Sequence, residues 1–504
     1  MAILQQTTLN KLEQSNDSSI SGSSNSVLTD NKVEIRKDSN VPNSVGGTFE
    51  IKTIALLMND GNQIDIKGYF SNLVVEESIF TSSISGQLSI TDDAGGLEKF
   101  VIHGGETLIL KMCKPNSNDI IIWREDLIVH KISKNSVSPL SLVSKFDIFF
   151  TSKSAVNSLK KNLFKSYKNA TVLEAVVSIY KEMSLNDLIT EDPKITLTTP
   201  FISTGVSPHK VIDYLAKRSC TKDKYFVFFE RFVPIYGNYP DGSPFTASHY
   251  FGSVEKLIKD AQNVPAKTII FAPKINATFE GSTIRASRYE RLENFNHMNG
   301  MLLGFYNSTI SSINPIKRSY KVQKINYSDD KDETQDFYSN KLFSTLNIFN
   351  TYNDVRNETP GRKLILSSIN ESVNRESWLG NHIYGQLSKS MFKISVDIQG
   401  GTNTIGVGNI VNFATPSQIS VMLNPQSAFP ELDPMYSGKY LVTTVIHSMS
   451  STQYIKTMHL GRGSSPLNFD KHTEYDATFD DIKASIKTAL GNKRTTWNSN
   501  FQSM

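Results

Sequence analysis

The sequence has 504 residues, of which 38% are hydrophobic and 20% are charged, and its formal net charge is +4. Because single hydrophobic cores rarely grow beyond about 250–300 residues, a chain of this length predicts several domains. The nearly balanced charge argues against a protein whose main task is to grip nucleic-acid phosphates, since such proteins concentrate a basic excess on one surface.

The cysteines, the N-terminal residues and the apolar runs indicate the cellular compartment in which the protein folds. The two cysteines, Cys113 and Cys220, lie far apart and outside any CxxC pair. This spacing argues against a disulfide scaffold or a zinc site and predicts two reduced, mostly buried thiols. No signal peptide is recognised. Apolar runs such as Ile54–Met58 are far shorter than the roughly 20 residues that span a bilayer, so we expect no stable membrane insertion. We expect the protein to be assembled inside a cell.

Residues 1–46 are rich in Ser and Asn and poor in aromatic residues. Too little apolar surface is present to offset the entropy lost on ordering, so we predict a flexible N-terminal arm.

Residues 47–152 show the two-residue period of half-buried strands. Apolar and polar residues alternate in the stretches Ile84–Ile90, Leu108–Met112 and Val143–Phe150. Turn-forming residues cluster between the runs, at 59–62, 92–96 and 114–118. Short alternating strands with this punctuation predict a first tube-like antiparallel β-barrel.

The period becomes helical within residues 153–265. Thr171 and Glu174 match a capping box ahead of an apolar face that extends to Tyr180. Ser207-Pro208 opens a second helix, with an N-cap residue and a proline at the first helical position. The apolar strand Tyr225–Phe229 follows, so we predict a small α/β insertion domain, and then a mixed connecting domain over residues 266–385.

Strand alternation returns within residues 386–465. It is strict over Phe392–Ile398, a second strand is predicted over Ile405–Phe413, and a hairpin is predicted from Lys439–His447 and Tyr454–Leu460. This pattern indicates the strands of a second tube-like β-barrel. On the first strand, we expect the apolar residues to fill the barrel and Lys393, Ser395, Asp397 and Gln399 to face a lumen or a neighbour.

Residues 466–504 are predicted to form a C-terminal helix, with one apolar face over 479–490, and a short basic tail. The predicted fold class is therefore mainly β with α+β insertions: two tube-like antiparallel β-barrel domains and a small α/β domain.

The sequence contains no HExxH, GxSxG, P-loop or GxGxxG motif. Gly400, Gly401, Gly406 and Gly408 lie between or within predicted strands, with no helix whose N-terminus could bind an anion. We therefore predict that they are turn and bulge positions.

Acidic and histidine residues also fail to form a recognisable site. His447 and His459 flank the predicted hairpin, but the nearby sequence offers no third and fourth metal ligands. Adjacent acids, as in Glu76-Glu77 and Asp92-Asp93, point to opposite faces of a strand or into solvent at a turn, so they do not form a facing carboxylate pair. We predict no catalytic, cofactor-binding or metal-binding residues, no cofactor and no enzyme activity, and replacing His447 or Glu106 should remove no chemistry.

Three groups of segments resemble, in order, the central hub proteins of the baseplate of T-even-type and related contractile-tailed bacteriophages. The first group comprises Gly61–Phe70, Leu73–Phe80, Ser85–Asp92 and Gly104–Leu108; the second comprises Pro208–Arg218, Tyr225–Glu230 and Phe251–Leu257; the third comprises Gly401–Val411, Gly438–Val442 and His447. Their order and spacing, from about Thr48 to Gly463, carry the resemblance. The first 46 residues, the stretch Tyr236–Thr246 and the tail after Arg462 have no counterpart in it.

The resemblance implies a homotrimer whose subunits each contribute two barrels to a pseudo-sixfold ring. The implied partners are a central spike protein below, tail-tube or tube-initiator proteins above, and surrounding baseplate proteins. DNA would pass through the lumen only in transit, and the location would be the virion tail baseplate after assembly in the host cytoplasm.

Two alternatives stay open. One is a tail-associated hydrolase of cell wall or glycan, which would need a cleft with convergent carboxylates or a nucleophile. The other is the hub of a non-contractile tail or of an injection system.

Overall fold

The computed structural model describes residues 49–92, 102–113, 120–136, 143–183, 185, 188–197, 201–221, 223–238, 244–262, 266–271, 283–294, 307–316, 318–326, 337–338, 340–341, 362–367, 377–390, 392–400, 405–417 and 431–466. Residues 45–504 form one compact unit. The predicted arm at 1–46 and the predicted helix at 479–490 lie outside the described residues, so both stay predictions.

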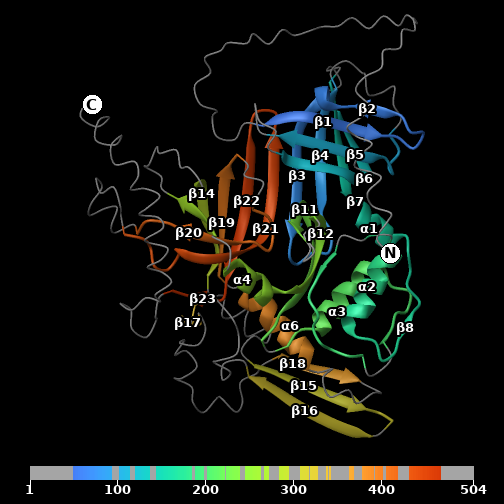
Figure 1. The fold of residues 1–504 in the computed structure, drawn as a ribbon, viewed down its shortest axis with the longest axis vertical. Coiled ribbons are helices and arrows are strands. Elements are labelled where there is room, and N and C mark those ends of the chain that lie inside the picture. Colours follow the sequence, from blue (N-terminus) through green and yellow to red (C-terminus); the bar gives the residue numbers. More distant parts are fainter. Residues whose placement is uncertain are drawn as a thin grey trace, which may run out of the picture. The chain divides into compact units, whose positions relative to one another are not determined.

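The first part of the unit is an antiparallel sheet in the order β2-β1-β5-β6-β7-β4-β3 (Figure 1). Its elements are β1 (Glu50–Leu57), β2 (Gln63–Asp65), the 3-10 helix η1 (Lys67–Tyr69), β3 (Phe70–Ser78), β4 (Ser85–Asp92), β5 (Thr107–Cys113), β6 (Ile120–Ser136) and β7 (Ser144–Ser152). The predicted alternation is confirmed, because Leu88, Leu110 and Ile148 are fully buried within one shared core.

An α/β segment follows this sheet. It contains α1 (Lys153–Leu159), β8 (Ser166–Tyr167), α2 (Val172–Glu182), β9 (Leu188–Thr190), β10 (Phe201–Ile202), α3 (Pro208–Arg218), β11 (Phe226–Asn238), β12 (Pro244–Ser253) and α4 (Val254–Gln262). Both halves of the capping box at Thr171 and Glu174 are present. Proline stands at the start of α3 as predicted, although the Ser207 side chain makes no cap hydrogen bond.

A closed barrel of six strands forms the last part. Its strands are β13 (Lys267–Phe271), β14 (Thr283–Asn294), β19 (Phe392–Gln399), β20 (Ile410–Ala414), β21 (Gly438–Ser450) and β22 (Tyr454–Arg462). They pair in the circuit β21-β20-β13-β14-β19-β22, and the pairing of β22 with β21 closes it. The strands β13 and β14, which complete the circuit, come from the stretch predicted as a connecting domain.

Two details of this barrel correct the sequence predictions. The strand predicted from Ile405 begins only at Ile410, because residues 405–409 form a turn in which the Asn409 Oδ1 accepts the Gly406 amide at 2.8 Å. In β19 the apolar set is buried as predicted, but Ser395 is only 8% exposed. The polar residues of β19 therefore do not all lie on an open face of the subunit.

The remaining elements are a sheet in the order β16-β15-β18, a short pair β17–β23, and helix α6. Their bounds are β15 (Asn307–Asn314), β16 (Ser319–Asn326), β17 (Asn340–Lys341), β18 (Arg362–Ser367), β23 (Ser464–Ser465) and α6 (Ser377–Ser388). Within the described residues, no helix has both the length and the apolar character needed to cross a membrane.

The fold class is confirmed as mainly β with short helices and one six-strand barrel. A second barrel is not formed by the pairings of the described strands, because β1 and β3 are not hydrogen-bonded to each other. Instead, β3 pairs with β21, which joins the first sheet and the barrel into a single sheet of 13 strands. The β3–β21 seam brings buried polar residues of both parts together.

Candidate functional site: a buried polar junction

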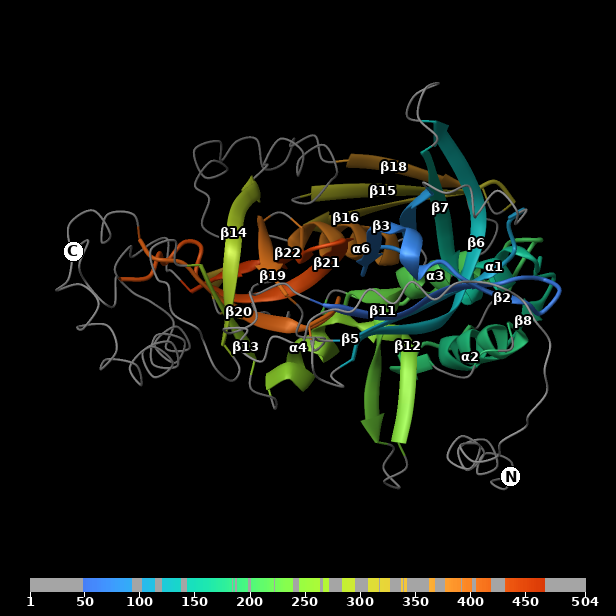
Figure 2. The same ribbon diagram turned by 90° about the horizontal axis from the view of Figure 1, so that it is seen from above.

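The seam between the first sheet and the barrel is crossed by β11. Strands β3 and β21 pair from Asn72↔Ser450 to Ser78↔Thr444. The ladder between β11 and β12 breaks between Glu230 and Ile235, so the backbone there is free to contact the seam. Figure 2 shows β6 and β7 on one side of β11 and the barrel strands β14, β19, β20 and β22 on the other. We call the following residues the junction: Glu77, Arg124, Glu230, Arg231, Phe232, His447 and Lys456.

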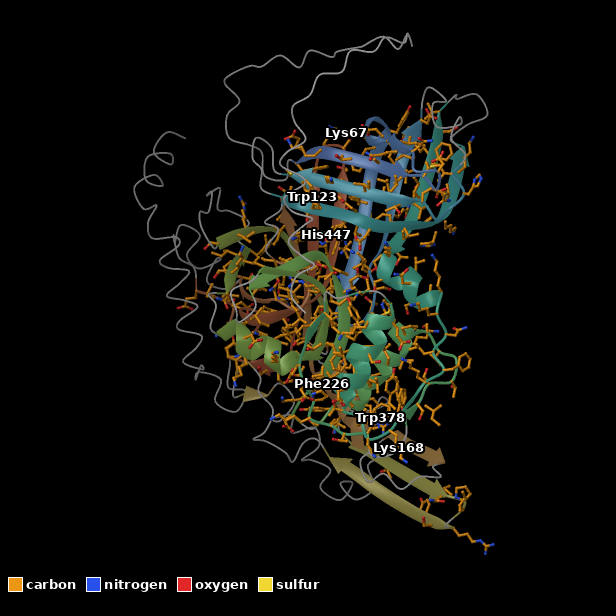
Figure 3. All side chains as sticks on the ribbon, turned by 45° about the vertical axis from the view of Figure 1, so that its right-hand side comes forward. Lys67, Trp123, Lys168, Phe226, Trp378 and His447 are labelled. Atoms are coloured by element: carbon orange, nitrogen blue, oxygen red, sulfur yellow. The ribbon has the colours of Figure 1, made fainter. Side chains whose placement is uncertain are left out.

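Glu77 lies at the centre of the junction because of strand parity. On β3 its neighbour Glu76 faces solvent, whereas Glu77 is 0% exposed. The Glu77 Oε2 accepts the backbone N–H of Phe232 at 2.5 Å, and its Oε1 lies 3.5 Å from the His447 Nε2. Figure 3 shows His447 between the sheet that carries Trp123 and the strand that carries Phe226.

The charge state of this pair follows from its surroundings. Burial alone would raise the pKa of Glu77, but His447, Arg231 and the Phe232 amide together hold the pKa below its usual value. Burial lowers the pKa of His447, whose Nδ1 lies 2.8 Å from the Tyr454 hydroxyl. The junction therefore holds a carboxylate beside a neutral imidazole at neutral pH.

Two cations from different elements face Glu77. Arg231 donates from Nη2 to the Asn409 Oδ1 at 2.6 Å, and this guanidinium fills the space that a side chain at Gly406 would need. Lys456, which is 2% exposed, donates from Nζ to the Ile405 carbonyl at 3.0 Å. Burial is the main reason that the pKa of Lys456 falls to about 8.

A buried ion pair ties β11 to β6. The Glu230 Oε1 accepts from the Arg124 Nη2 at 2.9 Å, and both side chains are almost fully buried. Arg124 also makes two hydrogen bonds to Asp126, at 2.7 and 3.0 Å, and donates to the carbonyls of Arg231 and Phe232. The other oxygen of Glu230 accepts from the Ser152 hydroxyl at 2.5 Å. The polar atoms of β11 are thus held from the first sheet and from the barrel.

A group of polar side chains next to the junction has the composition of a hydrolase site. The Ser154 Oγ lies 2.8 Å from the His209 Nε2 and 3.0 Å from the His249 Nε2, and the Tyr180 hydroxyl contacts the His249 Nδ1. Burial lowers the pKa of His209 to about 3. However, Ser154, His209 and His249 are 2%, 5% and 1% exposed, so a substrate has no access to the hydroxyl. These hydrogen bonds satisfy buried polar groups.

The other residues singled out in the sequence have structural surroundings. Glu106 accepts the backbone N–H groups of His103 and Gly104 in its own turn. His459 lies on β22, and the described residues contain no cluster of metal-ligand side chains to which it could belong. Asp92 corrects a prediction: it was expected in solvent at a turn, but it ends β4 and is 0% exposed. Asp93 and Gly401 lie outside the described residues.

Sequence reasoning missed most of the junction. Arg124, Arg231 and Lys456 are charged residues on strands, and nothing local shows that they point inward. Glu230 carried a usable signal, because it ends an apolar run whose other members are buried. Strand parity likewise predicts that one of Glu76 and Glu77 points inward. It does not identify the residues that this carboxylate contacts.

Comparisons with known proteins extend this description. No family model and no curated protein matches the chain. Among solved structures, a prophage MuSo2 43 kDa tail protein from Shewanella oneidensis shares 10% identity and a TM-score of 0.47, over 82% of this chain and 98% of that one. A tail protein from Neisseria meningitidis MC58 shares 9% identity and a TM-score of 0.46, over 81% and 96%.

A third similar structure is the Escherichia coli c3393 protein, described as a component of the type VI secretion system that resembles the T4 bacteriophage tail proteins gp27 and gp5. It shares 7% identity and a TM-score of 0.39, over 83% of this chain and 79% of that one. The three similar structures are therefore two tail proteins, one of them from a prophage, and a secretion-system component.

Proposed function

We propose that the chain is the central hub of a contractile phage tail baseplate. In this role it forms a homotrimer whose subunits build a pseudo-sixfold ring, with the tail tube above and a central spike below. The ring is a virion structural component, and DNA passes through its lumen without stable binding.

The convergence of the three resembling groups of segments at one junction carries this proposal. Glu77 belongs to the first group, Glu230 to the second and His447 to the third. In the fold, the Glu77 carboxylate contacts His447 and also accepts the amide of Phe232, two residues after Glu230. Residues about 150 and 370 positions apart are thereby fixed in one arrangement. Such convergence is expected if the groups descend from one fold rather than from separate chance matches.

The physics of the junction suits an adapter. A hub must hold two ring-forming modules in a fixed relation while force and DNA pass through it. The β3–β21 ladder makes the first sheet and the barrel continuous. The buried charges add register specificity, because sliding β3 by one residue would bury Glu76 and expose Glu77. A subunit joined in this way can act as one rigid third of a ring.

The hydrolase-like group found among the described residues is not accessible to a substrate. The group around Ser154 is buried, and His209 and His249 both serve as its hydrogen-bond partners. A hydrolase would need Ser154 to reach a substrate carbonyl, and this requires local unfolding of α1. Zymography on peptidoglycan distinguishes the two proposals: a clearing that is lost in Ser154→Ala would favour the hydrolase.

The oligomeric mass tests the hub proposal. One subunit has a mass of 56.3 kDa, so a trimer has three times this mass, about 169 kDa. Light scattering after size exclusion should give the trimer mass for the purified chain, alone or after addition of its spike protein. A monomer in both cases contradicts the proposal.

A further inference from the structure

The ribbon formed by β8 and β10 exposes large apolar side chains. Phe164 is 78% exposed, Ile202 61% and Val206 37%. Antiparallel pairing of Leu163 with Val206 and of Ser166 with Ile202 brings these residues onto one ribbon. The alternate residues Leu163 and Ser203 are buried, so strand parity places Phe164 and Ile202 on the outer face, and Val206, which pairs with Leu163, lies at its edge.

The outer face is ordered by its own packing. The Phe164 ring lies over Gly205, where an added Cβ would come within 2.7 Å of it. Gly205 has φ +73°, and its N–H donates to the Leu163 carbonyl at 2.8 Å. The tip of the Phe164 ring therefore packs against the ribbon at Gly205, while most of the side chain stays exposed. A contiguous exposed apolar surface of this kind marks an interaction site.

The surroundings of this face are strongly basic. Residues 153–168 contain five lysines and no acidic residue. All five lysines are exposed, and one of them, Lys165, pairs with the Glu182 carboxylate. The local excess is thus five lysines minus one glutamate, or +4, which equals the formal net charge of the whole chain. Figure 3 places Lys168 in this part of the molecule. We call the outer face of the ribbon and these lysines the basic ribbon.

A segment of the same chain has the complementary chemistry. Residues 469–482 contain five acidic residues and one lysine, a net charge of −4. Three aromatic residues and Ile482 are interleaved with the acids; the aromatic residues are Phe469, Tyr475 and Phe479. The segment begins three residues after Pro466, the last described residue. Its negative charge complements the lysines of the basic ribbon, and its large apolar groups can pack on the exposed apolar side chains there.

The positions of the two surfaces favour a contact between copies. The chain leaves the described fold just after β23, which pairs with β17, whereas the ribbon belongs to the α/β segment. In Figure 1, β23 and β8 lie on different sides of α4. Two different surfaces on separate sides of one subunit are the requirement for a head-to-tail contact, and such contacts form a ring when the rotation between subunits closes.

We propose that the acidic segment 469–482 of one copy docks on the basic ribbon of the next copy. This inference rests on the homo-oligomer proposed above and adds a specific strap between neighbouring subunits. It would cover Phe164 and Ile202 and neutralise the local lysine excess at the same time.

Disulfide trapping tests the strap. The variant carries Ile202→Cys together with Ile482→Cys. The natural thiols interfere little, because Cys113 and Cys220 are 4% and 3% exposed and burial raises the pKa of Cys220 to about 12. Mild oxidation of the full chain should give covalent dimers and trimers on a non-reducing gel. The matched control pairs Tyr320→Cys with Ile482→Cys, because Tyr320 is 66% exposed on β16, in another basic and apolar region; it should stay monomeric on the gel.

Charge reversal gives an independent arm. In the trapping variant, Lys160→Glu with Lys168→Glu should slow cross-linking about tenfold, and adding Asp480→Lys with Asp481→Lys should restore the rate. Three results would overturn the strap. The disulfide could form within one subunit, the Tyr320→Cys control could cross-link as fast as the Ile202→Cys variant, or the cross-linking rate could stay unchanged by the charge reversals. If the wild-type chain is a trimer by light scattering but no cross-link forms, the strap alone fails; if it is a monomer even with its spike protein, the hub proposal fails with it.

Discussion

Replacing Glu77 by glutamine tests the junction directly. Glutamine keeps the shape of the side chain and an oxygen that can accept the Phe232 amide, so the change removes the negative charge alone. Arg231 and Lys456 would then face no carboxylate at the centre of the junction. Glu77 attracts these two buried cations at longer range than a contact ion pair, whose disruption costs roughly 3–5 kcal/mol, so we expect the lower end, about 3 kcal/mol.

The matched control is Glu76→Gln on the same strand. Glu76 is exposed, so this change should alter the free energy of unfolding by no more than about 0.5 kcal/mol. Urea unfolding followed by circular dichroism at pH 7 measures both variants. The difference in the urea midpoint, multiplied by the slope of the unfolding free energy against urea concentration, gives the free-energy difference.

The pH dependence of the effect has a definite sign. The pKa of Glu77 is lowered in the fold from a usual value of 4.5, so its stabilising charge is fully present above that value and is lost as the pH falls through the folded pKa. The gap between wild type and Glu77→Gln should therefore be constant near pH 7 and should shrink under acid conditions. Equal midpoints for Glu77→Gln and Glu76→Gln at pH 7 would refute the reasoning.

Four further outcomes are expected. Lys456, with a folded pKa of about 8 against 10.5, should make the wild type gain stability as the pH rises from 8 to 10.5, and Lys456→Met should abolish this gain in urea titrations. The neutral, buried His209, with a pKa of about 3 against 6.5, should make stability fall as the pH drops below 6.5, and His209→Gln should reduce that slope. Ile394→Asp buries a charge at a 0% exposed position and should lower the free energy of unfolding by about 4 kcal/mol or more, whereas the partly buried Lys393→Gln should cost under about 1 kcal/mol. Limited proteolysis should trim residues 1–46 first and leave a stable fragment, because that composition cannot build a core; loss of the whole fold after this cut would contradict the prediction.

The regular elements could be predicted because their signals are local. The parity of Phe392–Ile398 predicted the burial of the apolar residues of β19, though not that of Ser395, and Thr171 with Glu174 predicted where α2 begins. The closure of the barrel could not be predicted in the same way. Its strands β13 and β14 lie more than 90 residues before β19, and no local pattern reports which distant strand will pair with them.

The junction was hidden for a related reason. Parity shows that one of Glu76 and Glu77 points inward, but the sequence does not reveal that Arg231, 154 residues later, faces the same place. The turn at residues 405–409 shows the same limit, because alternating apolar residues predicted a strand there. Gly408 at φ +80° and the Asn409 side chain instead shape a turn that receives Arg231 and Lys456. Tertiary contacts decided both cases.

Electron-microscopic projections of the purified oligomer along its symmetry axis test the hub proposal most directly. The account predicts a ring with a central opening, threefold symmetry and six barrel-sized lobes, two from each subunit. A compact particle without an opening, or a ring with other than threefold symmetry, would contradict it.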